Sequence, residues 1–425
     1  MTTKNDLGRG GSILLIMLIS ANALNYLFQL IMGRLLSIND FGTMNALFSL
    51  YMIASLPFGV LTVTTARYVA IYHATNDGNR IAVLLNQLVR YAFYIALVVL
   101  GLGIMLSPIV SKYTKINNTV LLILLSISLS FGMFFLLITG AIQGTKQFFK
   151  LGTLNLGSTL IKLIAGIGSV LLGFRLYGVM GSLIISVLVM IIIGFYLLRD
   201  YVNVRQLVQG NIENTEIGWK ALIRYAGIAF VVNLCIAFLS NIDMIFVKRF
   251  FTETQSGLYG TAALFGRLVF YIPNALVLAM FPIAAEAEAT GNNSLAVAIK
   301  SLLYVGVLAV VCAIGLNLFP AFAVNLLMGA KFLPAVPYVR ITVLMAIPVG
   351  LIVTLANYCL AIKKLKILTI SMVAGCLGCW AIIEFYHASI FNILAAISIT
   401  ASVLFVSNLI YLFKQKGRAT NLSSL

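Results

Sequence analysis

Long apolar runs, separated by short polar gaps, constrain this chain more than any other feature of its sequence. A helix needs about 20 residues to cross the hydrocarbon of a bilayer, and the runs reach that length. Hydrophobic residues make up 61% of the 425 positions and charged residues only 9%, whereas a soluble domain carries roughly 25% charged residues. Because so few charges could not cover the surface of a soluble protein, the sequence predicts a polytopic membrane protein.

The apolar runs predict an all-α fold with about twelve transmembrane helices. The first run is followed by many more, so we interpret it as a span and not as a cleaved signal peptide. The expected spans are 12–33, 42–66, 84–107, 117–141, 153–173, 177–198, 221–247, 257–283, 297–319, 338–361, 366–385 and 389–412. The stretch from Phe319 to Pro337 is assigned least clearly by this pattern.

The charged residues indicate how the chain is oriented. The chain carries 28 Lys and Arg residues against 11 Asp and Glu residues, a formal net charge of +17. In a soluble protein this excess would suggest a nucleic-acid partner. Here the basic residues lie mostly in the gaps between apolar runs, with about twice as many on the side of the N-terminus as on the other side. We therefore expect membrane lipids and not nucleic acid as partners, a location in the cell membrane, and both termini in the cytoplasm.

The sequence also predicts two related halves. The longest polar stretch follows the sixth span, which suggests lobes over residues 1–200 and 220–425, joined by a cytoplasmic linker over 201–219. Arg249 and Gly257 lie 215 residues after Arg34 and Gly42, in stretches that join equivalent spans. Because each half would contain six spans, an even number, both have the same orientation. The expected symmetry is a pseudo-twofold axis along the membrane normal.

Two basic residues lie in the middle of expected spans. Arg267 is in the eighth span and Lys162 in the fifth. A basic side chain near the bilayer centre costs about 2.5–3.5 kcal/mol, and at this depth neither side chain reaches the interface easily. Lining of a polar cavity is therefore the favoured interpretation for both residues. Because the fifth span is not among the four expected to line that cavity, Lys162 could instead enter a side portal or bond to a neighbouring helix.

Polar residues at helical spacing mark the first, second, seventh and eighth spans, which correspond between the halves. Such stripes are expected to face a central, wet, cationic cavity, because unpaired polar groups facing lipid are costly. Hydrogen bonding between helices is the alternative for the asparagines, and snorkelling at a helix end is the alternative for Arg67. The expected substrate-binding residues are Arg267, Tyr271, Asn274, Asn22, Asn25, Gln29, Asn45, Arg67 and Lys162. Asp243 is a candidate for ion coupling, with a salt bridge to a neighbouring basic residue as the alternative.

The sequence gives no indication of an enzyme, a cofactor or a metal site. His73 and His387 are far apart in the sequence, and Cys376 and Cys379, although spaced as CxxC, lie inside an apolar run without a second ligand pair. We interpret the cysteines as packing residues of a helix. A phosphate-binding loop of the GxxxxGK[ST] type is also absent, so we do not expect the chain itself to use ATP.

Several stretches, in order and over about residues 10–412, make the chain resemble a known family. It is similar to the polysaccharide (oligosaccharide) flippases of the multidrug/oligosaccharidyl-lipid/polysaccharide exporter superfamily. The stretches that carry the resemblance are Gly33–Gly42, Gly140–Gly144 with Phe148–Lys150, Gly178–Gly181, the run from Asp243 through Gly257, Tyr259 and Ala262 to Pro282, and Met328–Phe332.

The resemblance implies two six-helix lobes around a central cavity that opens alternately to each side of the membrane. It also implies a lipid-linked oligosaccharide cargo, usually on undecaprenyl pyrophosphate, and contact with other polysaccharide-assembly proteins. Arg267 would be the natural phosphate ligand. A multidrug or cation antiporter of the same superfamily is the first alternative, but such relatives typically hold carboxylates inside a lobe, and the expected spans of the first half contain none. A membrane scaffold of a polysaccharide synthase complex is the second alternative.

Overall fold

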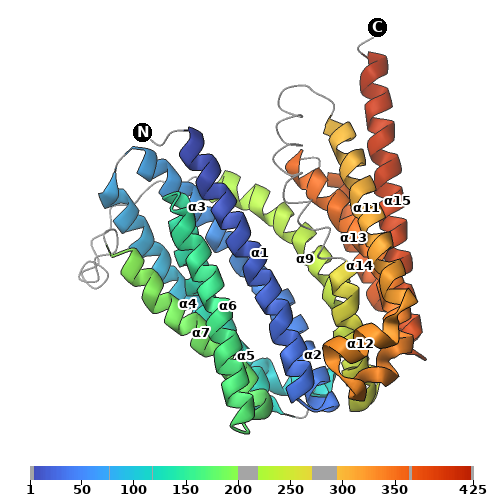
Figure 1. Cartoon of the computed structure of the whole chain (residues 1–425). Helices are drawn as coiled ribbons and strands as arrows, with labels where there is room; N and C mark the ends of the chain where they lie inside the picture. Colours follow the sequence, from blue (N-terminus) through green and yellow to red (C-terminus); the bar gives the residue numbers. More distant parts are fainter. Residues whose placement is uncertain are drawn as a thin grey trace. The chain divides into compact units, whose positions relative to one another are not determined.

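The computed structural model describes residues 4–75, 77–116, 118–199, 219–269, 294–362 and 366–422. In these ranges the chain is helical apart from short turns and contains no strand. Within the described residues, 11 helical segments are long and apolar enough to cross a membrane (Figure 1). The expected all-α membrane fold is confirmed. The linker over 201–219 and the second half of the eighth expected span lie almost entirely outside the described residues.

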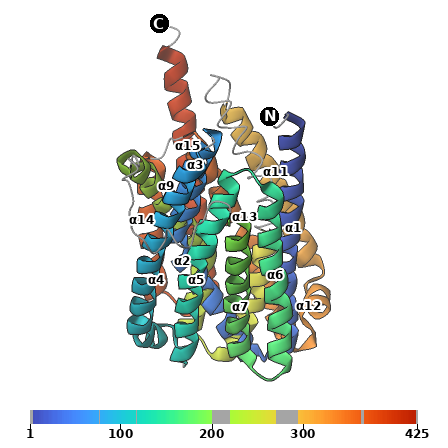
Figure 2. The same cartoon turned by 90° about the vertical axis from the view of Figure 1, so that its left-hand side faces the viewer.

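The chain divides into two compact units, Met1–Trp219 and Lys220–Leu425, which we call lobe 1 and lobe 2. Lobe 1 contains α1 (Lys4–Leu35), α2 (Ile38–Ser55), the 3-10 helix η1 (Leu56–Phe58), α3 (Gly59–Ala74), α4 (Gly78–Thr114), α5 (Thr119–Gly144), α6 (Phe148–Leu171) and α7 (Arg175–Leu197). Helix α5 is the centre of this lobe and packs against α3, α4 and α7 (Figure 2). Its most apolar stretch is 61% buried, against 11% for α4, which lies at the edge.

Two local features explain the shape of lobe 1. Pro57 lies in η1 and interrupts the second span, Ile38–Ala74, because proline removes a helical hydrogen bond and clashes with the preceding turn. Helices α3 and α5 approach closely at Gly140 and Gly144. A Cβ atom at Gly140 would lie 2.6 Å from the Thr62 carbonyl oxygen, and one at Gly144 would lie 2.7 Å from the Ala66 carbonyl oxygen. These two glycines therefore permit backbone contact that any larger residue would prevent.

Lobe 2 contains α9 (Trp219–Phe250), a helix over residues 253–269, α11 (Ser294–Leu318), α12 (Pro320–Met328), the 3-10 helix η2 (Ala330–Ala335), α13 (Val336–Ala361), α14 (Lys366–Phe385) and α15 (Ile390–Leu422). The stretch that the sequence assigned least clearly, Phe319–Pro337, thus forms a short helix and a 3-10 turn before α13. Other expected bounds are too short: α4 begins six residues before the expected span 84–107 and ends seven after it, because polar ends extend a helix beyond its apolar centre.

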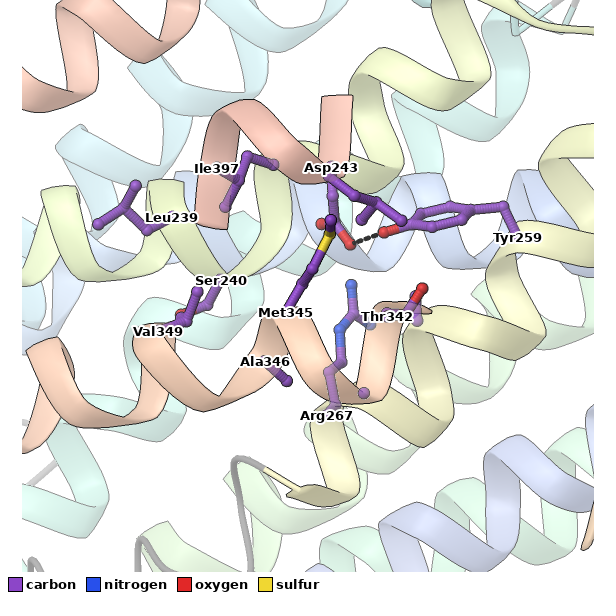
Figure 3. A pocket seen from close by; sticks show the side chains of 13 residues that line it. Leu239, Ser240, Asp243, Tyr259, Arg267, Thr342, Met345, Ala346, Val349 and Ile397 are labelled. Carbon is purple, nitrogen blue, oxygen red and sulfur yellow. Dashed lines mark hydrogen bonds between the residues drawn. The ribbon is translucent and has the colours of Figure 1, made fainter. Parts of the chain in front are cut away.

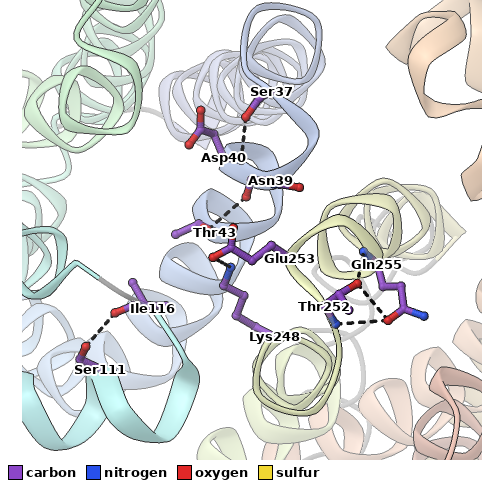
Figure 4. A network of polar contacts seen from close by, with 10 residues as sticks. All are labelled: Ser37, Asn39, Asp40, Thr43, Ser111, Ile116, Lys248, Thr252, Glu253 and Gln255. Atoms are coloured by element: carbon purple, nitrogen blue, oxygen red, sulfur yellow. Dashed lines mark hydrogen bonds and ion pairs between the residues drawn. The ribbon is translucent and has the colours of Figure 1, made fainter.

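The helix boundaries repeat between the lobes with the spacing that the sequence suggested. Helix α9 begins and ends 215 residues after α1 begins and ends, and α15 begins 215 residues after α7. The next helix of each lobe has the same N-cap. The Ser37 hydroxyl accepts a hydrogen bond from the backbone N–H of Asp40 at 3.1 Å, and the Thr252 hydroxyl accepts one from that of Gln255 at 3.2 Å (Figure 4). The local repeat is confirmed, and its pseudo-twofold axis stays a prediction.

Candidate functional site

A pocket with an empty volume of about 480 Å³ lies inside lobe 2. Four helices form it: α9, the helix over 253–269, α13 and α15. Most of its walls are apolar, and its polar groups come from a few side chains (Figure 3). The lining residues are Leu239, Ser240, Asp243, Tyr259, Ala263, Gly266, Arg267, Thr342, Met345, Ala346, Val349, Leu394 and Ile397. Pockets of this size and composition bind small molecules or parts of larger ones.

Close packing places these side chains. A Cβ atom on Gly266 would lie 2.7 Å from Thr342 Cγ2, so the glycine lets the helix over 253–269 approach α13. The hydroxyl groups of Ser240 and Thr342 donate to carbonyl groups of their own helices, at 2.8 and 2.7 Å. Their remaining lone pairs are acceptors, so the donors that the pocket offers to a ligand come from its other polar residues.

Asp243 of α9 is the carboxylate of this pocket. The hydroxyl of Tyr259, a completely buried residue, donates a hydrogen bond to Asp243 Oδ2 (Figure 3). Oδ1 is buried and has no hydrogen-bond partner among the described residues. A buried carboxylate oxygen without a donor is costly. Asp243 is therefore held on one side and left ready for a proton, a cation or a new donor on the other.

Arg267 brings a positive charge to the same pocket. It lies roughly 21 Å along its helix from residue 253, at mid-depth of a span. Its side chain is half-buried and extends toward Asp243 and Tyr259 (Figure 3). The guanidinium carries five donors in a rigid fork that fits carboxylate and phosphate groups. The pocket thus contains a guanidinium, a tyrosine hydroxyl and a carboxylate, and is not lined by cations alone as the sequence suggested.

Lobe 1 contains a separate polar cluster between α1 and α6. The Lys162 ammonium donates a hydrogen bond to Asn25 Oδ1 and lies 5.0 Å from the centre of the Phe28 ring. The Asn25 amide in turn contacts Thr159 Oγ1 at 3.4 Å. Of the alternatives that the sequence left open for Lys162, the bond to a neighbouring helix is the one present in the structure.

The remaining predicted site residues differ in their surroundings. Asn22 and Arg67 are exposed, and Gln29 is half-buried with its Oε1 atom lacking a hydrogen-bond partner among the described residues. Asn45 is completely buried and donates to the carbonyl group of Phe41 in its own helix, at 2.9 Å. Tyr271 and Asn274 lie outside the described residues. A cavity lined by spans of both lobes stays a prediction, because each group described above lies within one lobe.

Sequence periodicity missed part of the pocket in lobe 2. It placed Ser240 with Asp243 on one face of the seventh span, but it did not select Tyr259, Thr342 or Met345. Tyr259 was part of the stretch that carries the family resemblance, which was the available signal. In the described part of the chain, no group of three or more His, Cys, Asp or Glu residues could hold a metal ion. The Cys376 thiol contacts the Cys235 carbonyl oxygen at 3.7 Å, a contact between packed helices.

Three kinds of known protein are similar to this chain or differ from it. The sequence pattern of the family described as "Polysaccharide biosynthesis protein" matches residues 7–288. No curated protein sequence matches. The inward-facing structure of a multidrug resistance MATE family transporter of the MOP superfamily aligns at a TM-score of 0.73 and 13% identity, covering 95% of this chain and 96% of that chain.

Two further structures share the fold. The inward closed conformation of the lipid II flippase MurJ aligns at a TM-score of 0.69 and 15% identity, covering 94% of this chain and 87% of the flippase. The eukaryotic MATE transporter AtDTX14 aligns at 0.65 and 12% identity, covering 98% of this chain and 97% of that transporter. At such low identity the likeness establishes the architecture, while the cargo has to be inferred from the residues of the pocket.

Proposed function

Because the chain belongs to the family of polysaccharide biosynthesis proteins, we propose that it is a flippase for a lipid-linked oligosaccharide. It is a multi-pass membrane transporter of the MOP superfamily, with a family and fold of transporters and not of enzymes. In the proposed cycle the two lobes open a cavity alternately to each side of the cell membrane. The cargo enters from the inner leaflet and leaves to the outer leaflet, where polysaccharide assembly proteins would receive it. Both termini would lie in the cytoplasm.

The observation that carries this proposal is the position of Arg267. A guanidinium at mid-depth of a membrane helix is expensive, and it faces a pocket instead of lipid. A polyprenyl pyrophosphate headgroup is anionic and offers oxygen pairs that match the guanidinium fork. Tyr259 adds a second donor beside it. Together they would hold a phosphate group where the lobe now holds the carboxylate of Asp243.

Asp243 provides a way to couple this binding to an ion. Its carboxylate competes with an incoming phosphate for the donors of the pocket, so cargo binding would be favoured when a proton or a cation neutralises it. Oδ1, which is buried without a donor, is the atom where that proton or cation would bind. In this scheme Asp243 alternates between a counter-charge for Arg267 and a neutral neighbour of the cargo.

A multidrug or cation antiporter is the second candidate, and the same pocket gives it support. Asp243 lies among apolar side chains such as Met345, Leu239 and Val349, surroundings that an organic cation could also occupy. The two candidates make opposite demands on the charged residues. An organic cation requires Asp243 and is repelled by Arg267, whereas an anionic cargo requires Arg267.

The test is export in a complementation assay with a strain that lacks the chain's gene. Arg267→Ala is expected to abolish export at a normal protein level, and Arg267→Lys to restore part of it, because lysine offers a point charge without the fork. Arg340→Ala, which removes an exposed arginine of the same lobe, is the matched control and should export normally. Full export by Arg267→Ala would refute the role of this residue. Failure of the variant to accumulate would make Arg267 a structural residue.

A further inference from the structure

We infer that lobe 1 carries a second oxyanion-binding site, formed by Lys162 of α6 and Asn25 of α1. The site would hold an acidic group of the cargo, apart from the pocket of Arg267 in lobe 2. The inference rests on the proposed transport of an anionic lipid-linked glycan. It adds that the cargo is held by charge in both lobes.

The first argument is the absence of a neutralising acid. Among the lobe 1 side chains that the structure describes, from residue 13 onward, the two carboxylates are Asp40 and Asp77. Asp40 pairs with Arg175 at 3.0 Å, and Asp77 pairs with Arg80 at 3.1 Å. The partners given for the Lys162 ammonium are an amide oxygen and an aromatic ring, both uncharged. Its positive charge is therefore not balanced by a described carboxylate of its own lobe.

The second argument is depth. Lys162 lies roughly 21 Å along α6 from Phe148 and roughly 14 Å before Leu171, which places it near the middle of the span. Lys162 and Asn25 are both half-buried, so each keeps part of its surface open. An ammonium at this depth does not face hydrocarbon, since polar side chains inside membranes face the bundle interior or water. Asn22, exposed one turn earlier on α1, continues the polar surface toward the N-terminal end of the helix.

The third argument is the number of donors. An ammonium has three N–H groups, and the bond to Asn25 Oδ1 uses one of them. Phe28, which is completely buried, fixes the lysine from below without accepting a conventional hydrogen bond. The remaining donors and the charge suit an acceptor that is itself negative. Phosphate and carboxylate oxygens have this chemistry, and an organic cation or a neutral sugar does not.

The oxyanion could come from two parts of such a cargo: a phosphate of the lipid carrier or a carboxylate of an acidic sugar. Isothermal titration of the full-length protein in lipid nanodiscs separates them. The probes are farnesyl pyrophosphate for the carrier, digalacturonate for an acidic glycan, and neutral digalactose as the uncharged comparison. The variants are Lys162→Met, Lys162→Arg and the matched control Lys112→Met, which removes an exposed lysine near the end of α4.

Lys162→Met is expected to weaken binding of at least one acidic probe by about 10- to 100-fold, as the loss of a charged hydrogen bond does. Lys162→Arg should bind within about threefold of the wild type, and Lys112→Met should be unchanged, because one keeps the charge and the other is remote. A loss confined to farnesyl pyrophosphate assigns the site to the carrier phosphate. A loss confined to digalacturonate assigns it to an acidic sugar.

Three results would overturn the second site: a wild type that binds neither acidic probe, a Lys162→Met variant that binds both normally, or an equal loss of digalactose binding. Should Lys162→Met not fold, Lys162→Gln, which keeps a polar but neutral chain, carries the same test. The outcome is separable from the proposed function. Loss of export in Arg267→Ala together with normal probe binding in Lys162→Met would keep the flippase and remove the second site.

Discussion

The polar cluster of lobe 1 and the pocket of lobe 2 occupy lobes with matching helix boundaries but carry different charges. In lobe 1 the ammonium of Lys162 contacts an amide and a phenyl ring. In lobe 2 the guanidinium of Arg267 shares its pocket with the carboxylate of Asp243 and the hydroxyl of Tyr259. One region holds a cation beside neutral partners, and the other holds a cation beside an anion.

The spacing of the repeat explains how this difference arose. The residues 215 positions before Asp243, Tyr259 and Arg267 are Phe28, Met44 and Met52. All three charged or hydroxyl groups of the lobe 2 pocket are thus replaced by apolar side chains in lobe 1, and Phe28 is the ring on which Lys162 lies. The duplicated backbone has been kept while the chemistry of the two lobes diverged. The difference supports a division of tasks, with charge balance adjustable in lobe 2 and fixed in lobe 1.

The strongest way to break this comparison is to remove the carboxylate from lobe 2. Asp243→Asn should tighten binding of farnesyl pyrophosphate by about 10- to 100-fold, because an amide no longer competes for the donors of the pocket. Export should nevertheless fall, since the step that depends on neutralising the carboxylate is lost. Titration and the complementation assay measure the two effects. Binding and export that both stay at wild-type levels would exclude Asp243 from coupling.

A smaller effect is expected from the ion pairs of the two lobes. In lobe 2, Arg249 and Glu384 form a bidentate pair at 2.7 and 2.6 Å that joins the ends of α9 and α14. Glu384→Gln should lower the free energy of unfolding by about 1–3 kcal/mol, as expected for a partly buried charge-assisted pair.

The matched change in lobe 1 is Asp77→Asn, which breaks an exposed pair with Arg80 but keeps a residue able to cap α4. It should cost less than about 1 kcal/mol. Thermal unfolding in nanodiscs compares the two variants. An equal or larger loss in Asp77→Asn would contradict the ranking of the pairs by burial.

Sequence reasoning succeeded where the information is local. Apolar length gave the spans, Pro57 gave the interruption of the second one, and the spacing of Arg34 and Arg249 gave the offset at which helices later proved to begin and end. The Lys162–Asn25 contact was one of the open alternatives, because each residue was already an expensive polar group in an apolar run.

The pocket of lobe 2 could not be predicted as a whole, because its members meet only through tertiary packing. Periodicity shows which face of a helix is polar, but it does not show that α13 contributes Thr342 and Met345 to the surroundings of Asp243. Tyr259 carries no charge and reads as an ordinary apolar residue until its hydroxyl is seen to reach Asp243. The helix α12 was also missed, since its nine residues are too few to form a span.

The central claim is that this transporter moves an anionic lipid-linked cargo by means of its intramembrane cations. The most direct measurement is translocation in proteoliposomes of a fluorescent polyprenyl pyrophosphate-linked oligosaccharide, compared with the same oligosaccharide on a neutral polyprenyl ether. The wild type should move the pyrophosphate-linked cargo and leave the neutral one in place, and Arg267→Ala should move neither. Equal translocation of both cargoes, or undiminished movement of the anionic cargo by Arg267→Ala, would contradict the account.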